Sequence, residues 1–142
     1  MKNKIEIAKI IQYGAIYISK CEQYYYLSLD DFVIYERNDL KISFGLQDDT
    51  LNDPIQLYDD FRIIPVFQLN LTNEMRNFLE KENNKKITRE IKNLNENELY
   101  MYFRIICESD SLLGDRWGRY AKECLFNAAI EWCKKYHLPY NV

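Results

Sequence analysis

The chain has 142 residues, a formal net charge of −3 and an apolar fraction of 47%. Its 12 tyrosines and only 4 glycines argue against a disordered or low-complexity chain, which would be poor in aromatic and β-branched residues. This length suits a single domain, and we expect residues 1–142 to form one. The chain has no apolar run near the roughly 20 residues that span a bilayer and no recognisable signal peptide, so we expect a cytoplasmic protein without a membrane partner.

Negative charge is concentrated in one stretch of the first half. From Asp30 to Asp60 the chain has nine acidic residues and two basic ones. Residues 1–70 hold 11 acidic and 7 basic residues, whereas residues 71–142 hold 11 and 12. An acidic field opposes binding to nucleic acid, because that affinity comes largely from lysine and arginine contacts to phosphate. It favours a basic protein partner and speeds the encounter with it.

The four cysteines lack the paired short spacings of a zinc site or a redox motif. They are Cys21, Cys107, Cys124 and Cys133. We expect four reduced thiols in a cytosolic protein, which behave as small apolar side chains. The sequence indicates neither a metal ion nor another cofactor.

The first half has the pattern of short strands separated by turns. The clearest strand pattern is at 40–46, where apolar and polar residues alternate with a period of two. Residues 32–36 are rich in strand formers, and the polar residues 37–39 would join these two strands as a hairpin. Residues 47–54 are dense in turn formers and are predicted to be a loop.

Other strands are predicted at 15–19, 24–29 and 61–69. The last of these contains Pro65, which has no backbone donor and belongs at a sheet edge or a bulge. Asp30 and Asp31 would form the turn after the strand at 24–29. The first half is therefore predicted to form a small antiparallel sheet.

From Thr72 onward the apolar residues recur at helical spacing. Thr72 is predicted to cap a helix that is interrupted at 83–84 and then resumes. The next helix should start near Asn95 or Asn97 and run towards Glu108. Each of these helices has one apolar side, which would pack against the rest of the domain.

The strongest helical pattern lies in the last part of the chain. It follows the polar break at 109–111, and Pro139 would end it. With residues 1–70 rich in strands and residues 71–142 helical, we expect an α+β protein, a small antiparallel sheet covered on one face by the C-terminal helices.

Acidic and aromatic side chains occur together in the first half. The candidate partner-binding residues are Asp30, Asp31, Tyr35, Asp48, Asp49, Asp53, Tyr58, Asp59 and Asp60. Aspartate is also a good turn former, which would explain several of these acids one by one. Tyrosine, however, is enriched at binding hot spots. We expect an acidic protein that neutralises a basic partner, of the immunity-protein type that inhibits a bacterial toxin, with a nuclease as the leading candidate.

A small enzyme is one alternative. His137, the single histidine, follows Cys133 by four residues, which would place a thiol and a base on one helix face. Asp115 and Arg116 are a second polar pair that would serve a pocket between sheet and helices. Because the chain has no recognisable catalytic motif, we expect a protein that is not an enzyme.

Two further alternatives are a nucleic-acid-binding regulator and a structural subunit. The regulator would use Lys85, Lys86, Arg89, Lys92, Arg116 and Arg119. Acidic residues interleave with this basic run, namely Glu80, Glu82, Glu90, Glu96 and Glu98. They reduce its positive field, so a solvated helix face is the favoured interpretation. The subunit would bury Trp117 and Trp132 in an oligomer, although the sequence does not indicate an oligomeric state.

Overall fold

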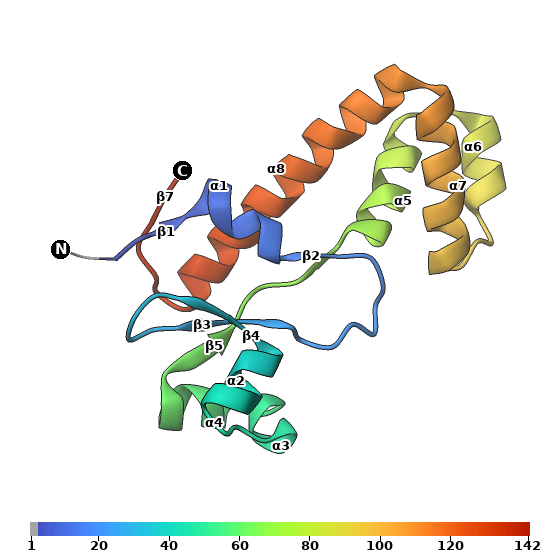
Figure 1. Ribbon diagram of the computed structural model, residues 1–142. Helices are drawn as coiled ribbons and strands as arrows, with labels where there is room; N and C mark the ends of the chain where they lie inside the picture. Colours follow the sequence, from blue (N-terminus) through green and yellow to red (C-terminus); the bar gives the residue numbers. More distant parts are fainter. Residues whose placement is uncertain (1–2) are drawn as a thin grey trace. The chain divides into compact units, whose positions relative to one another are not determined.

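A computed structural model describes residues 3–142 of the chain. Spatial contacts divide them into two compact units, whose elements are labelled in Figure 1. Unit 1 consists of residues 3–4 and 22–67, and unit 2 consists of residues 5–21 and 68–142. An antiparallel sheet lies in unit 1 and the long helices lie in unit 2, so the predicted α+β class is confirmed.

The sheet of unit 1 has three antiparallel strands. β3 (Tyr25–Ser28) is central, between β4 (Ile34–Glu36) and β5 (Ile63–Pro65). Aromatic and β-branched residues dominate all three, as expected for a pleated and partly buried surface. Each lies within a predicted strand and is shorter than the prediction. β5 is an edge strand, which confirms the prediction from Pro65.

The strand predicted at 40–46 is wrong, and so is the hairpin predicted before it. This segment belongs to α2 (Arg37–Ser43), a helix that begins directly after β4. Leu40 is fully buried in the core of unit 1, whereas Ile42 and Phe44 are 83% and 51% exposed. Two apolar residues of the alternating pattern are therefore exposed to solvent. In a helix, residues two positions apart do not lie on one face, so the alternation does not identify a buried face.

The loop predicted for residues 47–54 is wrong in part. It contains α3 (Asp48–Leu51) and the start of α4 (Pro54–Gln56). A turn of π-helix, η2 (Leu57–Phe61), follows at once. One leucine from α3 and one from η2 are buried with the sheet residues, so these short helices complete the core of unit 1.

Unit 2 contains two short parallel strand pairs. They are β1 (Ile5–Glu6) with β7 (Tyr140–Asn141), and β2 (Ala15–Ile16) with β6 (Leu69–Asn70). The strand predicted at 15–19 is thus confirmed for its first two residues only. Between β1 and β2, α1 (Ile7–Ile10) and the 3₁₀ turn η1 (Ile11–Tyr13) pack against the last helix (Figure 1).

Four helices make up most of unit 2. They are α5 (Leu71–Lys81), α6 (Lys85–Ile91), α7 (Glu96–Ser109) and α8 (Ser111–Lys135). All four were predicted, although the side chain that caps α5 is Asn70 and not Thr72. Asn95 caps α7 in a reciprocal capping box with Glu98, which fixes the predicted start. None of the helices within residues 3–142 is both long enough and apolar enough to cross a membrane.

The core of unit 2 is an aromatic and aliphatic cluster between α5, α7 and α8. Phe78 of α5 and Phe103 of α7 are buried, and Trp117 of α8 packs on both rings. The Trp117 ring centroid lies 4.9 Å from that of Phe103 and 5.6 Å from that of Phe78, both in edge-to-face geometry. Edge-to-face contacts of this kind add to the free energy gained by burial.

Candidate functional site

All nine predicted partner-binding residues lie in unit 1. Residues 22–67 contain ten acidic and three basic residues. Unit 2 contains 12 acidic and 14 basic residues. The chain is therefore strongly polarised in charge, and the net charge of −3 conceals an acidic unit and a weakly basic one.

Each of the three basic side chains in residues 22–67 forms an ion pair with an acid of the same unit. Arg37 contacts Glu22 and Asp48, each at 3.1 Å, and Lys41 contacts Asp48 at 3.0 Å. The third basic residue, Arg62, contacts Asp30 through its Nε at 3.0 Å. Seven acids are left without a basic partner among the described residues: Asp31, Glu36, Asp39, Asp49, Asp53, Asp59 and Asp60.

The structure brings the turn after β3 next to the end of η2. The Leu29 backbone N–H donates to the Arg62 carbonyl at 2.8 Å, and the Arg62 side chain reaches Asp30 of the turn. Arg62 ends η2 in the left-handed conformation, with φ of 53°. The turn is thereby joined to the residue that ends η2, the segment that carries Tyr58, Asp59 and Asp60. We call Asp30, Asp31, Tyr35, Tyr58, Asp59 and Asp60 the turn group.

Asp31 and Tyr35 belong to this group through a direct hydrogen bond. The Tyr35 hydroxyl donates to Asp31 at 2.9 Å, and the Val33 backbone N–H donates to the same carboxylate at 3.2 Å. Desolvation opposes ionisation of Asp31, but the hydrogen bonds from Tyr35 and its other donors outweigh it and lower the pKa. Asp31 therefore stays ionised to a lower pH than an ordinary aspartate. The Tyr35 ring is held in place beside Phe44, at 5.2 Å between centroids.

The remaining predicted acids form a second group at the start of α3. Asp48 accepts hydrogen bonds from Lys41 and Arg37, which lower its pKa. Asp53 caps α4 by accepting from the Gln56 backbone N–H at 3.2 Å. Asp48 and Asp53 thus stabilise local structure, whereas Asp49 is exposed and has no such partner among the described residues.

The two groups are attached at opposite ends of β3. Asp30 and Asp31 follow the last residue of that strand, whereas the Arg37 backbone N–H binds the Tyr24 carbonyl next to its first residue. Asp48 is held by Arg37 at this second end. The structure therefore collects six of the nine predicted residues in the turn group and places three elsewhere in the same unit.

Arg37 has a central role in unit 1 that no sequence pattern indicates. Its side chain is only 5% exposed, although it carries a full charge. Besides its two acids it donates to the Tyr26 hydroxyl at 2.8 Å and to Asn52 at 3.1 Å. A buried charge is stable only when it is paired and hydrogen-bonded, and this network satisfies that condition.

Exposed apolar side chains lie in the same unit as the acids. Tyr58 and Phe61, both in η2, are 46% and 40% exposed. Ile42 and Phe44 of the α2 region are more exposed still. The strand predicted at 40–46 would have buried both side chains. Large exposed apolar and aromatic side chains beside charged ones are typical of protein-binding surfaces.

The side-chain pair proposed for an enzyme is not assembled on one helix face. Cys133 is buried inside α8, and burial raises the pKa of its thiol to about 11. His137 lies beyond the end of α8 in the left-handed conformation, with φ of 54°. Arg116, from the second proposed pair, donates from Nε to Glu82 at 3.1 Å. Residues 3–142 contain no group of three histidine, cysteine, aspartate or glutamate side chains arranged to hold a metal ion.

No protein family model matches the chain, and no curated protein or solved structure matches it either. The role of a residue therefore cannot be carried over from a relative. The chemistry available to unit 1 is that of exposed carboxylates beside exposed aromatic rings, which suits recognition of a cationic surface.

Proposed function

We propose that the protein binds and neutralises a basic protein partner through the acidic surface of unit 1. The observation that carries this proposal is the set of seven acids without a basic partner in a segment of 46 residues that has only three basic side chains. Carboxylates that serve no ion pair repel one another and cost stability, so a cationic partner would relieve this repulsion. The exposed rings of Tyr58 and Phe61 would supply the apolar anchors.

The partner class that fits this surface best is a bacterial toxin domain, with a nuclease as the leading candidate. A nuclease holds its polyphosphate substrate in a positive cleft. An inhibitor that places carboxylates and aromatic rings in or beside that cleft matches its charge and excludes the substrate. In this role the protein would act as an immunity protein in the cytoplasm and would need no catalytic residue of its own.

The turn group is the proposed centre of the contact. Asp59 and Asp60 have no ion-pair partner among the described residues, and Tyr58 beside them is exposed. Asp48 and Asp53 are secondary, because each already serves Arg37 or the end of α4. A charge reversal at Asp48 would therefore lower the stability of unit 1. Reversal at Asp59 and Asp60 removes no such contact, so it tests binding without a loss of folding.

The test begins with the partner that co-purifies with the tagged protein from its native cell. The proposal expects a partner with a positive net charge, whose toxic activity is lost in the complex. It also expects that the double change Asp59→Lys and Asp60→Lys slows association at least tenfold at low salt, because electrostatic steering sets the rate of encounter.

The matched control is Glu123→Lys with Glu131→Lys, which reverses two exposed acids on α8 of unit 2. Both variants change the net charge equally, so a general charge effect would slow them equally. A partner that is acidic or neutral would overturn the proposal. Equal association rates for the unit 1 variant and the wild-type protein, with the same dependence on salt, would overturn it as well.

A further inference from the structure

We infer that a groove between α5 and α6 of unit 2 binds an oligophosphate, as in the di- or triphosphate group of a nucleotide. The groove has a volume of about 830 Å³. Its charged lining consists of Arg76 and Glu80 from α5 with Lys85, Arg89 and Lys92 from α6 and its end. This volume is within the range of small-molecule sites, which is about 300–1,000 Å³. The proposed ligand is independent of the acidic surface of unit 1.

The acids that flank the basic run in the sequence are turned to other partners. Glu82 binds Arg116, Glu90 accepts from the Tyr102 hydroxyl, Glu96 accepts from Ser19 and Asn70, and Glu98 completes the capping box of α7. Of the five acids that the sequence sets against the basic run, only Glu80 lines the groove. The lining of the groove thus contains four cations, of which Arg76 is half-buried, against one carboxylate, a balance that the sequence does not reveal.

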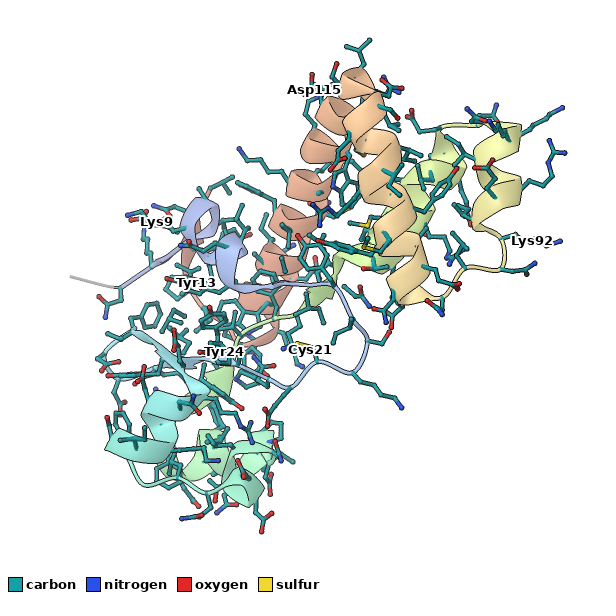
Figure 2. The ribbon with its side chains drawn as sticks, turned by 45° about the vertical axis from the view of Figure 1, so that its right-hand side comes forward. Lys9, Tyr13, Cys21, Tyr24, Lys92 and Asp115 are labelled. Atoms are coloured by element: carbon teal, nitrogen blue, oxygen red, sulfur yellow. The ribbon has the colours of Figure 1, made fainter. Side chains whose placement is uncertain are left out.

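The cations that line the groove are regularly spaced. Lys85, Arg89 and Lys92 recur at helical spacing and so lie along one side of α6. Arg76 is held by hydrogen bonds from its guanidinium to the Ile91 carbonyl at 2.8 Å and the Leu94 carbonyl at 2.7 Å. None of these four side chains has an ion pair within the described part of the chain. Figure 2 shows Lys92 at the end of α6 with its side chain directed outward.

The spacing of the cations favours a chain of phosphates over a single one. Lys85 and Lys92 are seven residues apart, which corresponds to about 10 Å along a helix. One phosphate can contact only part of this row, whereas two or three linked phosphates can contact successive cations. Thr88 adds a hydroxyl donor to the lining and the buried Ile91 adds an apolar floor. These are groups that a nucleoside attached to the phosphates would also contact.

The charges outside the groove favour a small ligand over nucleic acid. Unit 2 has 14 basic and 12 acidic residues, and four of the basic ones and one acid line the groove. The rest of the unit therefore carries more acidic than basic residues. A long polyanion would extend from the groove over a surface without net positive charge, whereas an oligophosphate would remain within it.

The test is calorimetric titration of the full chain with inorganic triphosphate, ATP and inorganic orthophosphate. Triphosphate or ATP should bind at least tenfold more tightly than orthophosphate. The double change Arg89→Gln and Lys92→Gln should weaken binding about tenfold or more, since two charge-assisted contacts are lost. Glu80→Gln should tighten it several-fold, because the one carboxylate of the lining is removed. Tighter binding of ATP than of triphosphate would identify a nucleotide ligand, and equal binding would identify the free oligophosphate.

The control is Lys122→Gln with Lys134→Gln, which removes two exposed charges from α8, away from the lining. It should leave affinity unchanged, and thermal unfolding should show all variants folded. Equal weakening in the control would mean attraction to net charge alone and would overturn the inference. So would the absence of triphosphate and ATP binding, whether or not a single-stranded RNA oligonucleotide binds to the same protein.

Discussion

The two units use carboxylates in different ways. In unit 2, acids serve the fold: Glu98 closes a capping box, Glu96 binds Ser19 and Asn70, and Glu82 binds Arg116. In unit 1, four acids have neither an ion pair nor a side-chain hydrogen bond within the described residues, namely Asp39, Asp49, Asp59 and Asp60. Acids that already form structural contacts are not available to a partner, whereas acids without such contacts are. The difference locates the binding surface that we propose, although the two units have similar numbers of acidic residues.

The two units also have separate cores. The largest change in stability that we expect comes from a substitution in the core of unit 2. Phe103→Ala removes a ring that is 3% exposed and that packs on Trp117, so we expect a loss of about 3–5 kcal/mol in the free energy of unfolding. Both tryptophans lie in unit 2, so their fluorescence during urea denaturation reports this loss. Amide hydrogen exchange should show that protection falls in α5, α7 and α8 more than in β3.

The control for this change is Met101→Ala on the same helix. Met101 is 54% exposed, so its loss should change stability by less than about 0.5 kcal/mol. Equal loss of protection in β3 and α7 after Phe103→Ala would mean that the two cores unfold together, and the contrast between the units would then be one of charge alone.

The second effect concerns the buried cation of unit 1. Arg37→Met removes the partner of Glu22 and Asp48 and the donor to Tyr26. We expect a loss of about 2–3 kcal/mol, because the hydrogen bonds are charge-assisted but the two carboxylates remain exposed and can be hydrated again. Amide hydrogen exchange in β3 and α2 measures this loss of stability.

Arg62→Met is the matched control in the same unit. Its ion pair with Asp30 is exposed on both sides, so its loss should cost about 0–1 kcal/mol. An equal cost for the two substitutions would contradict the assignment of Arg37 as the buried centre of unit 1.

The sequence predicts the helices of unit 2 better than the elements of unit 1. Long periodic segments with polar caps, such as the one that begins at Asn95, contain most of their own determinants. In contrast, the alternation at 40–46 predicts a strand where most of α2 lies, because Ile42 and Phe44 are apolar but exposed. Local periodicity cannot reveal which apolar residues a distant strand will cover, and β5 comes from a segment about twenty residues further on.

The candidate sites show the same limit. A count of charges is enough to place the acidic surface in the first half, but the Asp30 contact with Arg62 spans 32 residues and is not visible in a local pattern. In the sequence, acids stand beside the basic run of α6 and predict a reduced positive field. In the fold, Glu82 binds Arg116 and Glu90 accepts from Tyr102, both from later helices, and neither acid is among the residues that line the groove.

The third effect appears at alkaline pH and in unit 2. Burial, and then the hydrogen bond to Glu90, raise the pKa of Tyr102 to about 12 from 10.0. The folded state thus holds this proton more tightly than the unfolded state, so its contribution to stability is complete below pH 10 and is lost as the pH approaches 12. Tyr102→Phe should cost about 1 kcal/mol at neutral pH and should flatten the fall in stability over this alkaline range.

Thermal unfolding at a series of pH values measures this effect. The control is Tyr58→Phe in unit 1, since the exposed Tyr58 hydroxyl has no hydrogen-bond partner among the described residues. If stability falls as steeply at alkaline pH in Tyr102→Phe as in the wild-type protein, the contact with Glu90 does not cause that fall. The Glu90 carboxylate would then be free to neutralise the cations of α6.

The smallest expected effect bears most directly on the proposed function. Asp59→Asn with Asp60→Asn should raise stability by up to about 0.5 kcal/mol at low salt, because two mutually repelling charges are removed. At 1 M salt, where the screening length is about 3 Å, this difference should vanish. Thermal unfolding at both salt concentrations measures it, and Asn95→Ala, which removes a cap in unit 2, should cost about 1 kcal/mol at either. A loss of more than about 1 kcal/mol in the aspartate variant would show that these carboxylates hold unit 1 together. They would then resemble the acids of unit 2 and would no longer be available to a partner.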